Sequence, residues 1–215
     1  MHDESGGADR VGANGGGTAS EVVQVALPQT VVLSENHKIA DFRCSGSARI
    51  NGFFQKECPE LLAHRYCRVF ILPNPADTSE VWGFYTLSPS LLARARTTGS
   101  EQKRIPRGLP VPTMLIGFMG RHDGAPKGLG ASLIVDAARR VYLNEDLAAW
   151  GLMLDSEGGP ANAKLWQWYQ RQGFTPAKND PEAQKTDPNA GVMYAALKKL
   201  IPELNPAKAA PAKLR

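Results

Sequence analysis

Apolar side chains recur along this chain in two patterns, and the one with helical spacing marks its helices. Residues 128–143 carry apolar side chains at the spacing of one helix face, which predicts an amphipathic helix. Its buried face is expected to consist of Leu129, Leu133, Ile134, Ala137, Ala138 and Val141. Residues 161–172 predict a second helix, which Gly173 ends. A third is expected near residues 50–62, after a turn at 37–42.

The second pattern consists of short apolar runs rich in β-branched and aromatic residues, which predict strands. These runs cover residues 68–72, 81–87, 113–120, 150–154 and 193–197. The first two should form a hairpin around the Pro-Asn-Pro sequence at 73–75. Residues 88–96 are expected to form a short helix, and 97–112 a polar, basic loop. The alternation predicts a mixed α/β fold in which a helix crosses between two apolar strands.

Composition divides the chain into one domain and two tails. Of its 215 residues, 42% are hydrophobic, which is enough for a single core. Residues 1–20 are polar and Gly-rich and are expected to be disordered, and residues 202–215 to form a flexible basic tail. The domain then spans residues 21–201. Because no signal peptide or membrane-spanning apolar run is evident, we expect a cytoplasmic protein without a membrane partner.

Charge and cysteine content narrow the chemistry only slightly. The net charge of +4 permits an anionic cofactor or a nucleic acid as partner without demanding either. Cys44, Cys58 and Cys67 do not have the spacing of metal ligands, and their odd number favours reduced thiols over a disulfide framework. We therefore expect no metal site.

A glycine-rich turn opens the helix predicted at 128–143. It consists of Lys127, Gly128, Leu129, Gly130 and Ala131. Glycines at this spacing let backbone N–H groups at a helix N-terminus approach a pyrophosphate closely. Further along, Tyr169 precedes the pair Gly173-Phe174, and its phenol would lie near the other end of the same ligand. Together the two segments indicate a protein that binds coenzyme A and transfers an acyl group. A turn without a ligand and a tyrosine packed in the core are the alternatives.

These two segments resemble the motifs of the GNAT superfamily of N-acetyltransferases. Residues 125–130 match the phosphate loop of that family at both glycines, with Ala125 where the family has Gln or Arg. Asn162, Leu165, Tyr169 and the Gly-Phe pair fall at the spacing of its second motif, although the family has a small residue at the position of Leu165. The resemblance covers about residues 33–197. It implies a mostly antiparallel twisted sheet with helices on both faces and a splayed pair of parallel strands.

A narrower resemblance connects the chain with the acetyltransferase toxins of bacterial toxin–antitoxin pairs. The sequence Gly-Phe-Tyr-Thr-Leu at 83–87 is similar to one of their strands, and the Pro-containing stretch at 105–112 to the loop before their fourth strand. His37, Phe42 and Cys44 resemble a segment near their N-terminus. Those toxins acetylate the α-amino group of aminoacyl-tRNA and so block translation. The resemblance implies acetyl-CoA as co-substrate, with aminoacyl-tRNA, an antitoxin protein and a second copy of the chain as further partners.

The resemblance also assigns roles to individual residues. The backbone of Phe118, Met119 and Gly120 would hydrogen-bond the pantetheine arm and polarise the acetyl carbonyl. Residues 127–131 would hold the pyrophosphate, and Asn162 would contact the cofactor unless it only caps a helix. Tyr169 would act as the general acid that protonates the departing thiolate, which a phenol with a reference pKa of about 10 can do at neutral pH. His122 and Asp123 are nearby but are expected to be solvated, so no general base is assigned.

A basic cluster lies in and beside the loop expected at 97–112. It comprises Arg94, Arg96, Lys103, Arg104 and Arg107. These side chains would steer the phosphates of RNA, or form an ordinary solvated face. Arg139 and Arg140 are expected to complement the dipole of the helix whose end they occupy.

The leading hypothesis is an acetyl-CoA-dependent N-acetyltransferase of the toxin type that acts on aminoacyl-tRNA. A second hypothesis has the same chemistry act on a small amine or a protein N-terminus. A third is a degenerate member that binds acetyl-CoA, or only a partner protein, without catalysis. Ala125, Leu165 and the segment 118–122, which departs from the sequence of the toxins, favour the third.

Overall fold

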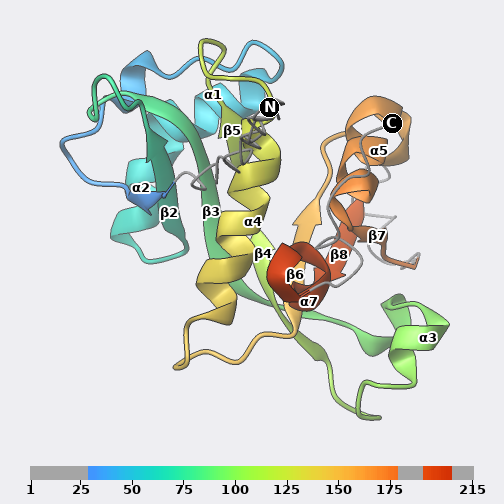
Figure 1. Ribbon diagram of the computed structural model, residues 1–215. Coiled ribbons are helices and arrows are strands. Elements are labelled where there is room, and N and C mark those ends of the chain that lie inside the picture. The colour runs from blue at the N-terminus through green and yellow to red at the C-terminus, as the bar shows by residue number, and fades with distance from the viewer. Residues whose placement is uncertain (1–28, 179–190, 205–215) are drawn as a thin grey trace, which may run out of the picture.

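A single twisted sheet organises the computed structural model, which describes residues 29–178 and 191–204 (Figure 1). In spatial order its strands are β1 (Val31–Val32), β2 (Arg68–Pro73), β3 (Val81–Leu92), β4 (Val111–Ile116), β6 (Gly151–Asp155), β8 (Val192–Ala196) and β7 (Thr175–Pro176). Among the described strands only β4 and β6 pair in parallel, and the other pairs are antiparallel. The expected mixed, mostly antiparallel fold is confirmed.

The parallel pair separates at its carboxyl end, and this opens the sheet. β4 and β6 are in register from Thr113 opposite Gly151 to Ile116 opposite Leu154. Beyond Ile116 the chain forms β5 (Met119–Arg121), which pairs with β3 and no longer with β6. The strand predicted over 113–120 is therefore interrupted at 117–118. At this break Oγ1 of Thr86 on β3 accepts a hydrogen bond from the amide of Phe118 at 2.9 Å, and the amide of Thr86 donates to the Phe118 carbonyl at 2.9 Å.

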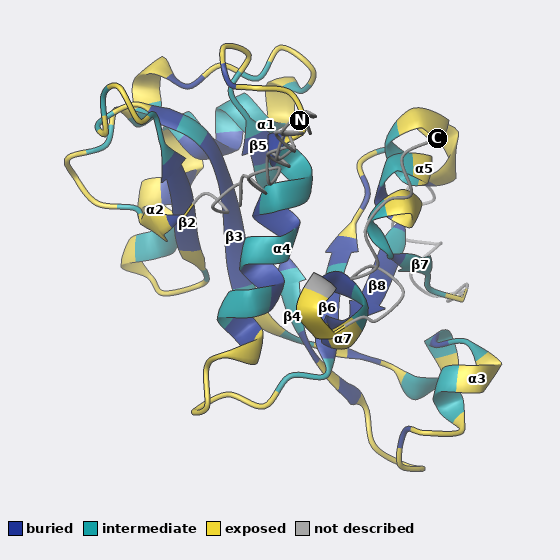
Figure 2. Cartoon of the chain, in the orientation of Figure 1, coloured by how far each residue is buried: buried dark blue, intermediate teal, exposed yellow. Residues whose placement is uncertain are grey.

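Helices cover both faces of the sheet because its strands alternate apolar side chains. Phe84 packs with α1 (Ala48–Gly52), the π-helical turn at Phe53–Glu57 and α2 (Cys58–Ala63) on one face. Its neighbour Tyr85 packs on the other face, under α4 (Leu129–Tyr142). Figure 2 shows the buried side of α4 turned toward the strands. The six residues predicted to form that side are all buried.

The remaining helices are short or follow β6. α5 (Ala163–Gln172) starts at the cap residue Asn162 and ends at Gly173, whose φ of 108° requires glycine. α3 (Gly99–Gln102) lies within the long loop before β4, and α7 (Leu197–Leu200) follows β8. Short 3-10 turns occupy Ile39–Asp41, Arg94–Arg96, Gly159–Ala161 and Pro202–Leu204.

One predicted element is wrong. Residues 88–96, expected to be helical, instead extend β3 to Leu92, and only Arg94–Arg96 form a 3-10 turn. The extension pairs Ser88–Leu92 with Leu115–Val111 of β4, and exposed and buried side chains alternate, so that Leu91 is exposed and Leu92 buried. Pairing with a strand distant in sequence outweighs the local preference here. β1 and β7, of two residues each, were not predicted.

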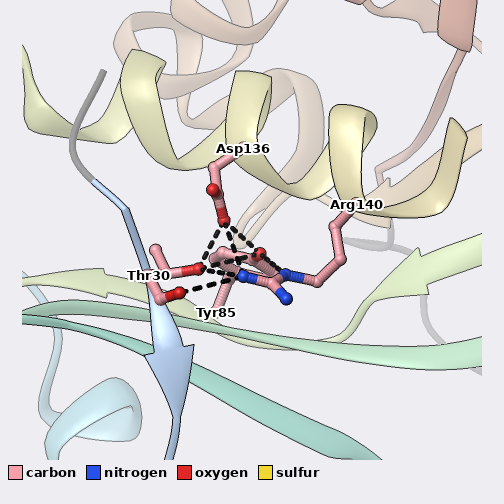
Figure 3. A network of polar contacts seen from close by, with 4 residues as sticks. All are labelled: Thr30, Tyr85, Asp136 and Arg140. Atoms are coloured by element: carbon pink, nitrogen blue, oxygen red, sulfur yellow. Dashed lines mark hydrogen bonds and ion pairs between the residues drawn. The ribbon is translucent and has the colours of Figure 1, made fainter. Parts of the chain in front are cut away.

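A polar network fastens α4 to the sheet and to the first described residues (Figure 3). The carboxylate of Asp136 accepts hydrogen bonds from the hydroxyls of Tyr85 and Thr30, each at 2.5 Å. Arg140 donates to the Thr30 carbonyl at 2.9 Å and to the Tyr85 hydroxyl at 3.2 Å, and it stacks over the ring of Phe70. Arg140, expected to complement a helix dipole, is thus part of a cross-link that fixes α4 beside the opening in the sheet.

The predicted tails fall largely outside the described part of the chain. Residues 1–20 lie outside it entirely, and of residues 202–215 only the 3-10 turn at Pro202–Leu204 lies within it. Cys44, Cys58 and Cys67 are all free thiols, as predicted. The helices of the described residues include none that is both long and apolar enough to span a bilayer.

Candidate functional site

A cavity of about 1000 Å³ lies where β4 and β6 separate. One wall comes from residues 116–121 and from the segment at 44–50 that leads into α1. The opposite wall comes from residues 154–158, at the end of β6, and from one face of α5. Four segments that are far apart in sequence thus meet at the carboxyl ends of the two parallel strands. A volume of this size suits a ligand with a long flexible arm.

The predicted segment Phe118, Met119 and Gly120 lies in the wall of this cavity. Because the segment pairs with β3 on one side and no longer with β6, its other backbone edge faces the cavity and offers hydrogen-bonding groups there. The position is tightly packed: a Cβ on Gly120 would lie 2.7 Å from Ile50 and 2.8 Å from Phe84. The ring of Phe118 stacks on that of Phe53 at 3.5 Å between centroids. The backbone is therefore held rigidly.

Tyr169 lies in the opposite wall, on α5. Its ring contacts those of Trp168 and Phe174, and its hydroxyl has no hydrogen-bond partner among the described residues. Burial, and then the negative charge of Glu157, raise the pKa of this phenol to about 12. A phenol in this position keeps its proton at neutral pH and borders a cavity, which are two properties of a proton donor.

The glycine-rich turn lies beside the cavity and not in its wall. Gly128 caps α4 with a φ of 91°, and the amides of Leu129 and Gly130 have no partner within the helix, whereas the amide of Ala131 donates to the Gly128 carbonyl at 3.1 Å. Gly130 packs against Trp168 of the cavity wall, so the two sequence motifs meet in space. The side chain of Leu129 is buried in the core, whereas Lys127 is exposed and Ala131 partly buried. The turn therefore offers its backbone N–H groups, and Lys127 its charge, at the edge of the cavity.

Arg121 connects this turn to the cavity. Its Nη1 atom donates hydrogen bonds to the carbonyl of Ala125 at 2.5 Å and to that of His122 at 3.1 Å. Ala125 itself is buried. The guanidinium therefore holds the start of the glycine-rich turn in place from the cavity side.

Asn162 fits both roles that were considered for it. It lines the cavity, and it also caps α5 by accepting a hydrogen bond from the amide of Leu165 at 3.5 Å. Its amide group donates to the carbonyl of Glu157 at 3.2 Å. These two contacts make Asn162 a brace between α5 and the loop after β6.

Neither His122 nor Asp123 offers a free base to the cavity. The Nδ1 atom of His122 accepts a hydrogen bond from the amide of Gly124, and its ring packs on Phe42. His122 lines a separate pocket of about 340 Å³ and not the cavity. Asp123 lines the cavity but accepts three hydrogen bonds from the amide and hydroxyl of Ser45. Both groups hold local loop structure.

The predicted RNA-binding cluster is not brought to the cavity. Its loop leads into the amino end of β4, whereas the cavity lies at the carboxyl end, and α3 marks this distant corner in Figure 1. Arg94 donates to the carbonyls of Ile105 and Gln102, and Arg96 donates to that of Lys178. These two side chains therefore stabilise the loop. The exposed members are Lys103, Arg104 and Arg107.

Other charged residues line the cavity and were not singled out from the sequence. The cations are Arg49, Arg121, Lys164 and Arg171, and the unassigned carboxylates are Asp155 and Glu157. Lys164 and Arg171 lie on the face of α5 that carries Trp168, so helical spacing from the second motif could have found them. Arg49 comes from a segment far from both motifs, and no local signal marks it.

Ser156 supplies an independent sign that the cavity is built for a ligand. It follows β6, lines the cavity and is 1% exposed, and its hydroxyl has no hydrogen-bond partner among the described residues. An unsatisfied buried hydroxyl costs about 1–3 kcal/mol. A polar atom of a bound molecule would satisfy this group. The orphaned hydroxyl and the free backbone edge at 117–121 both fit the amide-containing pantetheine arm of acetyl-CoA.

Three solved structures share this architecture, whereas no family model matches the sequence. AtaT complexed with acetyl-methionyl-tRNAfMet has a TM-score of 0.66 and 22% identity over 80% of this chain and 96% of that one. KacT has a TM-score of 0.65 and 20% identity over 80% and 96% of the two chains. The toxin AtaT bound to the C-terminus of the antitoxin AtaR and acetyl-CoA has a TM-score of 0.58 and 19% identity over 80% and 94%.

The fold is that of the GNAT-type toxins. At these levels of identity the similarity establishes the fold alone. The predicted splayed parallel pair of this GNAT-type fold is confirmed by β4 and β6, which pair to Ile116 and Leu154 and then diverge around the cavity. The described residues contain no cluster of three or more side chains suited to a metal ion.

Proposed function

We propose that this protein is an acetyl-CoA-dependent N-acetyltransferase of the toxin type, which acetylates the α-amino group of aminoacyl-tRNA. One observation carries the proposal. The cavity between the diverging ends of β4 and β6 has an unpaired backbone edge in one wall and the protonated phenol of Tyr169 in the other. The fold shared with AtaT, which was solved with acetyl-methionyl-tRNAfMet, supports the choice of acceptor.

In this proposal each part of acetyl-CoA has a counterpart in the site. The pyrophosphate binds the first-turn amides of α4 at Gly128 to Gly130, with Lys127 beside it, where the helix dipole favours an anion. The pantetheine arm follows the free backbone edge of Phe118, Met119 and Gly120. An amide of that edge hydrogen-bonds the acetyl carbonyl and stabilises the oxyanion as the amine attacks.

Tyr169 completes the transfer. When the amine nitrogen bonds to the carbonyl carbon, the carbon–sulfur bond breaks and the sulfur leaves as a thiolate. The phenol, whose pKa is raised to about 12, gives its proton to that sulfur. The products are an amide and free coenzyme A.

Positive charge at two places supports an RNA acceptor. Arg49, Lys164 and Arg171 surround the cavity, and the exposed Lys103, Arg104 and Arg107 extend along the same molecule at the other end of β4. Phosphate backbones are attracted by such charges over a long distance.

An antitoxin protein is a further partner in this proposal, since AtaT was solved with the C-terminus of its antitoxin. The toxin type also places the protein in the cytoplasm, where translation occurs.

Mass spectrometry of aminoacyl-tRNA tests the proposal directly. Purified protein is incubated with acetyl-CoA and charged tRNA, and the aminoacyl adenosine released by nuclease is weighed. We expect an added acetyl group with the wild-type chain and a large loss of it with Tyr169→Phe. If the protein binds acetyl-CoA but releases no thiol with any amine, the degenerate, binding-only hypothesis replaces this one.

A small amine or a protein N-terminus is the second candidate, and one observation favours it. The basic loop lies at the end of β4 remote from the cavity, Arg94 donates to carbonyls within that loop, and Arg96 donates to the carbonyl of Lys178. The same reaction with polyamines and short peptides in place of tRNA distinguishes the two. A turnover with these acceptors that exceeds the turnover with aminoacyl-tRNA would identify the smaller acceptor.

A further inference from the structure

The carboxylates in the cavity wall differ in how far their oxygens are already engaged. Asp123 accepts hydrogen bonds from Ser45 at both of its oxygens, and Asp155 accepts one from the amide of Gly191. Glu157 accepts one from the hydroxyl of Ser47 at 3.0 Å, through Oε2. Its Oε1 atom has no partner among the described residues. Glu157 therefore has one oxygen available to a ligand.

The contact with Ser47 places this carboxylate on a particular side of the cavity. Ser47 caps α1 by accepting a hydrogen bond from the amide of Ile50, and Ile50 packs on the sheet face opposite α4. The glycine-rich turn belongs to α4. Through Ser47, Glu157 thus contacts the segment that leads into α1. With the pyrophosphate at the N-terminus of α4, the acceptor would approach from the side of α1 and Glu157.

Glu157 is also within electrostatic reach of the proposed proton donor. Its negative charge contributes to the raised pKa of Tyr169, and both side chains line the same cavity. Asn162 donates a hydrogen bond to the Glu157 carbonyl and fixes the backbone that carries the carboxylate. The two groups have opposite uses, because a phenol with a raised pKa gives a proton and a carboxylate accepts one.

We propose that Glu157 binds the ammonium group of the acceptor and removes its proton before attack. The inference rests on the proposed N-acetyltransferase function and supplies the general base that sequence reasoning did not find. Ser47 acts as a positioning residue, because it reaches the acceptor only through the carboxylate that it holds.

The proton inventory balances without any further reactant. The ammonium gives one proton to Glu157, and the neutral amine forms the carbon–nitrogen bond as the carbon–sulfur bond breaks. The thiolate takes the Tyr169 proton and leaves as the thiol. The surplus proton on the new amide nitrogen returns to the phenolate through solvent, and Glu157 releases its proton to solvent. The sum is ammonium plus thioester giving amide, thiol and one proton.

Other titratable and charged groups face the same cavity and define the electrostatics. They are Cys44 from the segment before α1, Arg49 from α1, Arg121 and Asp123 from β5 and the loop after it, Asp155 from β6, and Lys164, Tyr169 and Arg171 from α5. Because Glu157 combines an available oxygen with a contact to the α1 side of the cavity, the pH test is directed at this residue.

The decisive experiment measures single-turnover acetylation of methionyl-tRNA by wild type and Glu157→Gln at pH 6 and at pH 8.5. Without the carboxylate, the enzyme can acetylate only those acceptor molecules whose amine is already neutral. For an amine pKa of about 8, this neutral fraction is small at pH 6 and exceeds half at pH 8.5. We expect a deficit in kcat/KM of about 100-fold at pH 6, narrowing to less than tenfold at pH 8.5. Glu145→Gln, an exposed glutamate outside the cavity, is the matched control.

Three further measurements make the result unambiguous. Glu157→Asp keeps a carboxylate one methylene shorter and should recover part of the activity at pH 6, and Ser47→Ala should show a smaller deficit of the same pH dependence. Calorimetry should give acetyl-CoA affinities within twofold of wild type for all variants. An equal deficit at both pH values, or none, in an enzyme that does acetylate methionyl-tRNA overturns the role of Glu157. A wild-type chain that acetylates no amine overturns the proposed function instead.

Discussion

The indole ring of Trp168 on α5 packs against Gly130 on α4, so that a Cβ at Gly130 would lie 3.2 Å from two of its carbons. The contact joins the two sequence motifs, since one belongs to the glycine-rich turn and the other to the helix that carries Tyr169. It also means that the proposed pyrophosphate site and the proposed acid are parts of one packed unit.

Replacing Gly128 by Ala should weaken this unit through the backbone alone. A φ of 91° is costly for any residue with a Cβ, and no atom lies within 4 Å of the position, so a steric clash makes no contribution. We expect a loss of about 1–2 kcal/mol in stability and a weaker affinity for acetyl-CoA. Urea denaturation and calorimetry measure the two effects. Gly99→Ala, which also meets no atom within 4 Å but lacks a positive φ, should leave both unchanged.

Tyr169→Phe should separate chemistry from binding. The variant keeps the ring contacts with Trp168 and Phe174 and loses only the hydroxyl. Turnover should fall about 100-fold or more, because general acid catalysis contributes factors of that size, whereas acetyl-CoA affinity should stay within twofold. Thiol release and calorimetry give the two numbers. Unchanged turnover in the direct assay would remove Tyr169 from the mechanism.

The free energy of unfolding should decrease at alkaline pH, because the folded state keeps its buried tyrosine hydroxyls protonated. Burial is the largest cause that raises the pKa of Tyr169 and of Tyr194 to about 12, from a reference of about 10 in the unfolded chain. The folded state therefore binds these protons more tightly, and the stabilisation present below pH 10 is lost as the pH rises toward 12. Urea midpoints at pH 8 and pH 10.5 should show the decline. Tyr194→Phe should make it shallower, and a pH-independent midpoint would contradict the burial of these hydroxyls.

The network around Asp136 predicts an energetic coupling between α4 and β3. Asp136→Ala leaves the hydroxyls of Tyr85 and Thr30 without their acceptor and should cost about 1–3 kcal/mol, and Tyr85→Phe alone about 1 kcal/mol. The double variant should cost less than the sum, because both changes break the same hydrogen bond. Denaturant titration of the four proteins gives the coupling free energy. Asp146→Ala, on the exposed loop after α4, is the control and should be near neutral.

Removing the exposed charges Lys103, Arg104 and Arg107 together should distinguish an RNA acceptor from a small one. If RNA is bound, the triple alanine variant should bind tRNA more weakly and with a shallower salt dependence, because fewer phosphates are neutralised and fewer counterions released. Its acetyl-CoA affinity should be unchanged, because the loop lies at the opposite end of β4 from the cavity. Filter binding at several salt concentrations measures this. Identical tRNA affinity would assign those charges to a solvated surface.

Local periodicity predicted α4 and α5, but a helix was also expected at 88–96, where β3 continues because it pairs with a distant strand. The six apolar positions of α4 are all buried because the helical repeat places them on one face independently of the rest of the chain. The extension of β3 to Leu92 depends on its pairing with β4, and the irregular pairing at residues 117–118 involves the hydroxyl of Thr86 on β3. The local sequence of residues 88–92 and of residues 117–118 does not indicate which distant strand they will contact.

The candidate site divides in the same way. Tyr169 was identified from a motif and the segment from Phe118 to Gly120 from the family resemblance, and both lie in the cavity wall. Glu157, Ser156 and Arg49 have no motif, and only the divergence of β4 and β6 brings them together. The basic loop was recognised as a cluster, but its distance from the cavity follows from strand direction, which composition does not encode.

The hydrogen bonds of Thr30 set a limit on how far the protein can be shortened. Its hydroxyl and carbonyl engage Asp136 and Arg140, and the next residues, Val31 and Val32, form the edge strand β1 on β2. A version trimmed for crystallisation to begin at Thr30 would replace an ordinary peptide amide with a charged amino terminus directly beside Arg140. A start several positions earlier keeps that positive charge away from the guanidinium, and is the sounder boundary for expression.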